Sequence, residues 1–258
     1  MKNKFYVNAE GNDDAAYKTA MQFACELSKK DQEINRVVLL IHTKTNTGWF
    51  ERLFDSETVK KLFIGIRFKD CSPLYKFETM ITYKKSQYGN PQDVVICCAL
   101  DSEDIFKIDE HYSAKYIIAV PWLKQLSEKW IKTWAATEIS GKSESSVDKF
   151  LEPTAIVKKA LENLTKCINM SSGLNHPMDN DRAKTFIKAL HKYENELNDD
   201  IVGSYLVREL NWDPSVAKEI EKLINTLNQG RFFKGGEKTG LQNYYKQWKK
   251  ECEEEQSA

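Results

Sequence analysis

The sequence predicts an α/β fold, with a Rossmann-like, doubly wound and mostly parallel sheet, followed by an all-α C-terminal domain. The first observation is the segment 93–123, in which two apolar runs, Val94–Leu100 and Tyr116–Val120, flank a short amphipathic stretch. This pattern is typical of a strand, a crossover helix and a parallel strand whose sheet is covered on both faces. The second observation is that strand-like runs end near residue 140, and helical periodicity continues to the C terminus.

The N-terminal elements alternate between strand and helix. We expect strands at Lys4–Asn8, Arg36–His42, Asp93–Leu100 and Tyr116–Val120, with Phe63–Phe68 and Lys76–Tyr83 between them, the latter alternating like an edge strand. We expect helices at Asp13–Lys29, within Trp49–Phe63, and as one long closing helix over Trp122–Ile139. Strands that alternate with helices in this way favour a doubly wound sheet.

The domain boundaries follow from a change of composition. Residues 1–140 form the predicted Rossmann-like domain, residues 141–153 a serine-rich and charged linker, and residues 154–258 a helical domain. We expect helices at Thr154–Met170, Asp181–Leu197, Asp200–Leu210, Pro214–Asn228 and Leu241–Glu255. The fourth helix, Pro214–Asn228, has the clearest boundaries. Its start is marked by Asp213 as N-cap and Pro214 at the first helical position, and its end by Gly230. The third and fourth of these helices are expected to form a pair that resembles a helix-turn-helix.

Composition limits the classes of partner. The 38 basic and 38 acidic side chains cancel, so the chain has no global field that would attract nucleic acid or an anionic membrane. The six cysteines form no C-x-x-C pair, and no apolar run approaches the length that spans a bilayer. The N-terminus lacks the apolar stretch of a secretory signal. We therefore expect a reduced, cytoplasmic protein with no membrane contact.

Polar side chains follow several of the predicted strands. In an open α/β sheet, ligands bind beyond the carboxyl ends of the strands. The candidate ligand-binding residues there are Asn8, Glu10, Asn12, Thr45, Asn46, Asp101 and Trp122. His42 also ends a strand and is the best candidate for a general base, although such a histidine more often bonds to the backbone. A small polar ligand or a protein partner at this edge is the expectation.

The acidic residues that follow the predicted strand Asp93–Leu100 have two interpretations. Asp101 and Asp104, with Glu10, have the hard oxygen ligands that a divalent metal prefers. Capping explains the same residues without a ligand, because Asp101 stands at an N-cap and Asp104 in the first helical turn, and we favour it. G-x-G-x-x-G is absent, so there is no NAD or FAD fingerprint, and the histidines and cysteines form no zinc motif. The cofactor is unknown.

The segment 231–250 mixes basic and aromatic residues. Arg231, Lys234, Lys238 and Lys246 are the candidates for contact with nucleic acid, because lysine and arginine bind phosphates and the nearby rings stack on bases. The alternative is that the rings pack the helical core while the lysines are solvated, and the sequence favours this alternative because the excess positive charge is local and modest.

The first sixty residues carry a family resemblance. The opening strand, the helix Asp13–Lys29, the strand Val37–Ile41 and the threonine-rich loop after it resemble the α/β domain that closes pyruvate kinases. The resemblance implies a fold and transfers no functional residue.

These patterns leave three hypotheses of function. The preferred one is a non-catalytic protein whose α/β domain binds a ligand or partner and whose helical domain is an interaction module. The alternatives are a metal-dependent enzyme acting on a nucleotide or phosphoester, and a nucleic-acid-binding protein that uses the segment 231–250. No catalytic motif is recognisable, so the sequence leaves open whether the chain is an enzyme.

Overall fold

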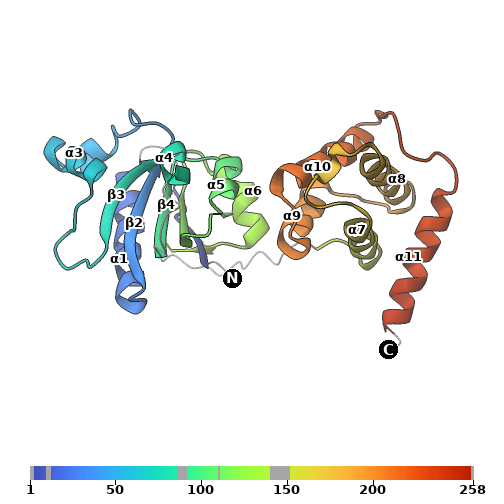
Figure 1. Ribbon diagram of the computed structural model, residues 1–258, viewed down its shortest axis with the longest axis horizontal. Helices are drawn as coiled ribbons and strands as arrows, with labels where there is room; N and C mark the ends of the chain where they lie inside the picture. The colour runs from blue at the N-terminus through green and yellow to red at the C-terminus, as the bar shows by residue number, and fades with distance from the viewer. Residues whose placement is uncertain (1–2, 10–12, 86–91, 110, 140–151, 257–258) are drawn as a thin grey trace. The chain divides into compact units, whose positions relative to one another are not determined.

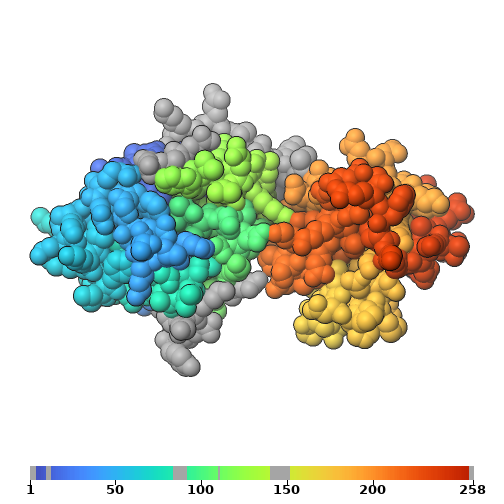
Figure 2. Space-filling model, turned by 90° about the horizontal axis from the view of Figure 1, so that it is seen from above, coloured from blue at the N-terminus to red at the C-terminus, as the bar shows by residue number. Residues whose placement is uncertain are grey.

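The computed structural model describes residues 3–9, 13–85, 92–109, 111–139 and 152–256. The chain divides into two compact units, Met1–Lys149 and Phe150–Ala258, and the division falls inside the segment predicted as a linker. Most of that segment lies outside the described residues. In the space-filling view the α/β unit runs from blue to green and the helical unit from yellow to red (Figure 2).

The first unit contains one sheet. Its strands are β1 Asn3–Tyr6, β2 Ile34–Ile41, β3 Leu74–Thr79, β4 Gln92–Cys98, β5 Ala114–Val120 and β6 Thr137–Glu138. They are all parallel, in the order β3-β2-β4-β5-β1-β6. This confirms the α/β class predicted from the sequence, with β1 inserted between β5 and β6. Figure 1 shows the labelled strands β3, β2 and β4 of this sheet side by side.

Helices cover both faces of this sheet. They are α1 Asp14–Lys30, α2 Phe50–Leu53, α3 Ser56–Ile64, α4 Met80–Lys85, α5 Ser102–Asp109 and α6 Lys124–Trp134. Alternate residues of β2, such as Val37 and Leu39, join side chains of α1, α2 and α3 in one buried cluster. Their neighbours Val38 and Leu40 are equally buried, and successive strand residues point to opposite faces. Both faces are therefore covered, which explains why the strands read as continuous apolar runs.

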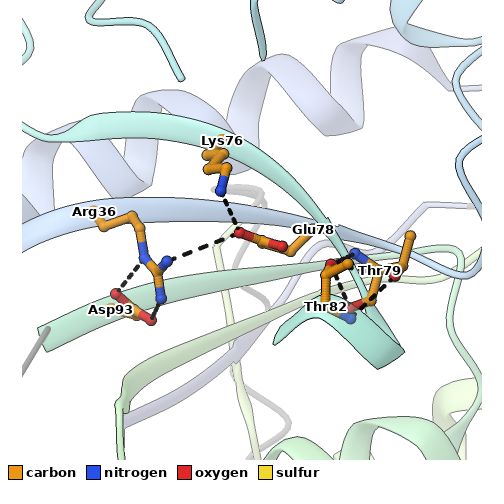
Figure 3. A network of polar contacts seen from close by, with 6 residues as sticks. All are labelled: Arg36, Lys76, Glu78, Thr79, Thr82 and Asp93. Carbon is orange, nitrogen blue, oxygen red and sulfur yellow. Dashed lines mark hydrogen bonds and ion pairs between the residues drawn. The ribbon is translucent and has the colours of Figure 1, made fainter. Parts of the chain in front are cut away.

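Three elements differ from the sequence prediction. The strand expected over Lys76–Tyr83 stops at Thr79, and α4 follows. The hydroxyl of Thr82 accepts from Thr79 N at 2.8 Å, and that of Thr79 accepts from Thr82 N at 3.3 Å, so the two threonines cap the new helix reciprocally (Figure 3). The alternation of apolar and polar side chains over residues 77–83 predicted a strand and gave no sign of this capping.

The other two differences have backbone causes. The closing helix expected over Trp122–Ile139 ends at Trp134, because Ala135 adopts a left-handed conformation (φ 43°) and the chain returns to pair β6 with β1. In Phe63–Phe68 no strand forms, because α3 extends to Ile64 and only Ile66 makes an isolated antiparallel bridge, with Tyr75.

The second unit is helical. It contains α7 Ala155–Cys167, the short 3₁₀ helix η1 Gly173–Asn175, α8 Pro177–Tyr193, α9 Asp199–Leu210, α10 Pro214–Asn228 and α11 Leu241–Gln256. The boundaries of α10 are those predicted, and the carboxylate of Asp213 accepts from Ser215 N at 2.7 Å. One buried cluster joins the five α-helices around Trp248 and Trp212. Among the described helices none is long and apolar enough to cross a membrane.

The expectation of a fully reduced chain is wrong for one pair of cysteines. Cys25 of α1 and Cys71, which precedes β3, form a disulfide with their Cα atoms 5.6 Å apart. The remaining cysteines, Cys97, Cys98, Cys167 and Cys252, are free. The sequence did not reveal the pair because its members are 46 positions apart in sequence and no spacing motif marks them.

Reduction of this disulfide is expected to destabilise the α/β unit by about 2–4 kcal/mol, because the cross-link restricts the unfolded chain. Urea unfolding with and without dithiothreitol measures the effect, and the Cys25→Ser/Cys71→Ser variant should unfold at the reduced midpoint under both conditions. Thiol titration of the oxidised, urea-unfolded chain provides a direct check. A titration that finds all six thiols free would contradict the disulfide.

Candidate functional site

The carboxyl ends of the strands bring the first set of predicted residues to one edge of the sheet. His42 and Thr45 follow β2, Asp101 follows β4, and Trp122 follows β5. His42, Thr45 and Asp101 are exposed, as is Asn8 after β1, whereas Asn46 and Trp122 are half-buried. Glu10 and Asn12 lie outside the described residues. A ligand site at this edge remains a prediction.

His42 and Asp104 meet at this edge. The Nδ1 atom of His42 lies 3.5 Å from an Asp104 carboxylate oxygen, and the other oxygen of Asp104 accepts from Lys107 Nζ at 2.7 Å. The His42 side chain is 68% exposed and the Asp104 side chain 16%. Asp104 therefore lies beside a histidine that is open to solvent, an arrangement compatible with binding a polar ligand.

Asp101 caps α5. Its carboxylate accepts from Asp104 N at 2.9 Å, which satisfies one of the free amides at the start of the helix. Within the described part of the chain, no group of three or more histidine, cysteine, aspartate and glutamate side chains is arranged to hold a metal ion. Asp101 and Asp104 are thus placed as capping predicts, while Glu10 lies outside the described residues.

The threonine-rich loop after β2 satisfies its own polar groups. Thr43 N donates to Asn46 Oδ1 at 3.1 Å, and the hydroxyls of Thr43 and Thr45 lie 2.9 Å apart. The rings of Trp49 and Trp122 lie beyond this loop with their centroids 5.9 Å apart. The edge of the sheet therefore carries two tryptophan side chains as well as the His42–Asp104 pair.

The second set of candidates gathers around the loop 231–240. We define the basic loop surface as three cations of this loop and two lysines of α8, which packs against the loop: Arg231, Lys234, Lys238, Lys184 and Lys188. Lys188 Nζ donates to Gly235 O at 2.6 Å and lies 5.3 Å from the Phe233 ring centroid. Burial lowers the pKa of Lys188, and the positive charges of Lys238 and Lys184 lower it further against the opposing effect of Asp181. Lys238 and Lys184 therefore lie close enough to Lys188 for their charges to act on it, beside the opposing charge of Asp181.

Glycines hold this loop against α8. Gly236 N donates to Asp181 Oδ1 at 3.0 Å, and Glu237 N donates to Thr185 Oγ1 at 2.8 Å. Gly236 has φ 68°, and a Cβ at this position would lie 2.9 Å from Thr185 N. Only glycine permits both the conformation and the approach. The loop is consequently held on α8 by hydrogen bonds to side chains of the helix and by the close approach of its backbone at Gly236.

The aromatic residues of segment 231–250 divide into two groups. Phe233, Tyr244, Tyr245 and Trp248 pack against the helical core, as the structural alternative predicts. Phe232 does not, because 89% of it is exposed. Among the cations, Arg231, Lys234, Lys238 and Lys246 are all exposed, the last on α11. The segment 231–250 therefore exposes these four cations and the ring of Phe232 to solvent.

The α9–α10 pair is a less suitable interface. Asn211 turns the chain with a left-handed conformation (φ 56°), and Trp212 is buried between the helices. The carboxylate of Asp213 caps the N-terminus of α10. A negative charge at this position opposes the approach of a phosphate to the helix end.

A groove lies beside the basic loop surface. Its volume is about 490 Å³. Its lining combines apolar, acidic and basic side chains with the glycines of the loop: Met178, Asp181, Arg182, Thr185, Phe186, Gly235, Gly236, Glu237 and Tyr244. Neither the groove nor Lys184 and Lys188 was predicted, since α8 and the loop are about fifty residues apart in sequence and only the fold brings them together.

Sequence reasoning also missed a buried polar network in the α/β unit. Arg36 of β2 donates to both carboxylate oxygens of Asp93 of β4, at 2.9 and 2.6 Å, and Lys76 lies 2.8 Å from Glu78 of β3 (Figure 3). Glu78 is 4.0 Å from Arg36 and links the two pairs. Two predicted strands begin with residues of opposite charge, Arg36 and Asp93, and this was the sequence signal that could have indicated the pair.

Together, these features describe an α/β unit joined to a helical unit with a basic loop surface. The family model described as a domain of unknown function, DUF1889, matches residues 153–249, which lie in the helical unit. No curated protein matches the chain.

A solved structure of a nuclease-deletion mutant of the Type ISP restriction-modification enzyme LlaGI, in complex with a DNA substrate mimic, is similar at 13% identity and a TM-score of 0.29. The match covers 98% of this chain and 30% of that one, so the chain spans less than a third of its length. A similarity at this level supports no inference about function.

Proposed function

We propose that the helical unit binds single-stranded nucleic acid through the basic loop surface. The observation that carries the proposal is the combination of five cations on α8 and the loop 231–240 with Phe232, which is 89% exposed. Lysine and arginine side chains attract phosphates, and an accessible ring stacks on a base. Exposing a phenylalanine to water has no benefit for folding.

The surroundings favour a single strand. The ring of Phe232 needs an unpaired base on which to stack, whereas a duplex offers mainly its phosphates. The chain has no net charge, so attraction to nucleic acid depends on this local cluster. Because the glycines hold the loop on α8, the cations stay together without a partner, which lowers the entropic cost of binding. For the α/β unit, binding of a small polar ligand or a partner beside His42 remains our proposal.

Replacing Lys184 and Lys238 together by glutamine is expected to remove two phosphate contacts. Fluorescence anisotropy with a labelled dT oligonucleotide, from 50 to 200 mM salt, measures the affinity. The slope of log affinity against log salt should fall in magnitude by about 1.4 for two contacts to a single strand. Lys166→Gln/Lys222→Gln, which removes two exposed lysines from α7 and α10, is the matched control and should leave the slope unchanged.

Phe232→Ala tests the stacking contribution in the same assay. The affinity should fall by about tenfold with little change in the salt slope, because one base loses its aromatic partner. The substitution leaves the fold intact because the ring is not packed. An affinity that is absent at 50 mM salt, or independent of salt in the intact chain, would contradict the proposed function.

A further inference from the structure

The groove beside the basic loop surface has the chemistry of a base-binding pocket. Phe186 and Tyr244 line it with ring surface, and Met178, which is 60% exposed, adds an adaptable apolar side chain. Ring centroids of Phe186 and Tyr244 lie 5.6 Å apart. The volume of about 490 Å³ lies within the range of small-molecule pockets and exceeds what one nucleobase needs.

Two carboxylates line the same groove. One oxygen of Asp181 accepts from Gly236 N, and one oxygen of Glu237 accepts from Tyr244 Oη at 3.1 Å. Among the described residues the second oxygen of each carboxylate has no hydrogen-bond donor. An ionised carboxylate only accepts hydrogen bonds, so the groove selects a ligand that presents N–H donors.

The groove also contains a cation. Arg182 is 46% exposed and uses Nη1 to bond Cys167 O at 2.6 Å and to approach Asp179. A guanidinium carries five N–H donors, so further donors remain for a ligand. The groove therefore presents acceptors and donors together.

We propose that this groove holds a guanine base of the bound strand, an inference that rests on the proposed function. Guanine alone among the common bases has two adjacent N–H donors, N1–H and the N2 amino group. They match the two oxygens of the Glu237 carboxylate, because the oxygen that accepts from Tyr244 Oη keeps a second lone pair. The O6 and N7 acceptors of guanine match an arginine. Adenine and cytosine place a ring acceptor beside their amino group, and thymine has one N–H between two carbonyls, so each can donate at most one N–H bond to this carboxylate.

The position of the groove agrees with a strand that crosses the basic loop surface. Gly235 and Gly236 line the groove, and Lys188, which bonds Gly235 O, belongs to the basic loop surface. Phosphates of the strand would contact the lysines while one base enters the groove between Glu237 and Arg182. The negative charge of Glu237 thus meets a base and not a phosphate.

The experiment compares four oligonucleotides in fluorescence anisotropy: eleven dT residues, and the same strand with a central dG, dA or dC. A single guanine avoids structures that guanine runs form. The intact chain should bind the dG strand about tenfold more tightly than the dT strand, because a bidentate hydrogen-bonded pair discriminates by this order. The dA and dC strands should bind within about threefold of the dT strand.

Glu237→Gln replaces one acceptor by a donor and should reduce the guanine preference to less than about threefold. Glu196→Gln, at an exposed position between α8 and α9, removes the same charge and should keep the preference. Salt-dependent binding of all four strands with equal affinity would overturn the guanine site and leave the proposed function standing. A preference that survives Glu237→Gln would also overturn it, and failure of every strand to bind would overturn both proposals.

Discussion

Replacing Asp93 by alanine is expected to lower the stability of the α/β unit by about 3–5 kcal/mol, because it leaves a buried guanidinium without its partner. Asp93 is fully buried, and the Arg36 side chain is 15% exposed. The two make a bidentate pair, the strongest geometry for these groups. Burial raises the pKa of the Asp93 carboxyl, and the charge and hydrogen bonds of Arg36 oppose that rise.

The remaining neighbours of Arg36 do not compensate for the loss. Glu78 is 4.0 Å away and is itself engaged by Lys76 at 2.8 Å, while the Tyr83 ring centroid is 5.9 Å from the guanidinium carbon. The variant therefore either keeps a poorly solvated cation or admits water between β2 and β4. Both outcomes weaken the centre of the sheet.

Hydrogen exchange of the full chain, followed by mass spectrometry, measures this loss at the amides of β2 and β4. The matched control is the double variant Arg36→Met/Asp93→Leu, which removes both charges and is expected to recover most of the stability. A loss below about 1 kcal/mol in Asp93→Ala would show that Arg36 reaches solvent without its partner.

Local patterns predicted most of the fold for a physical reason. Parallel strands buried on both faces must be apolar throughout, so β2, β4 and β5 were visible as runs. The helix α10 was visible because Asp213 and Pro214 fix its start through local hydrogen bonds and backbone geometry. At Thr79 and Thr82 two local signals disagreed. The alternation of apolar and polar residues predicted a continued strand, whereas the reciprocal hydrogen bonds of the two threonines start a helix.

The candidate sites depended on contacts that sequence order does not contain. Asp104 was predicted in the first turn of the helix after one strand, but its partner His42 follows a different strand. Arg231, Lys234 and Lys238 were found as a basic segment, whereas Lys184, Lys188 and the groove required α8 to pack beneath the loop. The disulfide of Cys25 and Cys71 was missed for the same reason.

Replacing Trp212 by alanine is the corresponding large change in the helical unit, with an expected loss of about 3–5 kcal/mol. Trp212 is 2% exposed and lies two residues after Leu210, the last residue of α9. Its backbone N donates to Leu206 O at 3.0 Å, and its indole Nε1 donates to Thr165 Oγ1 of α7 at 2.8 Å. One side chain thus joins α7 to the α9–α10 connection, and its removal leaves a cavity that the helices fill only in part.

Trp212→Phe is the matched control, because it keeps a ring in the core and removes the indole hydrogen bond. Its expected cost is smaller, about 1–2 kcal/mol, since Thr165 Oγ1 still donates to Leu161 O at 2.8 Å and is not left unsatisfied. Hydrogen exchange at the amides of α9 and α10 measures both variants in the full chain. Equal losses in the alanine and phenylalanine variants would show that the hydrogen bond to Thr165, and not the packing of the ring, stabilises this connection.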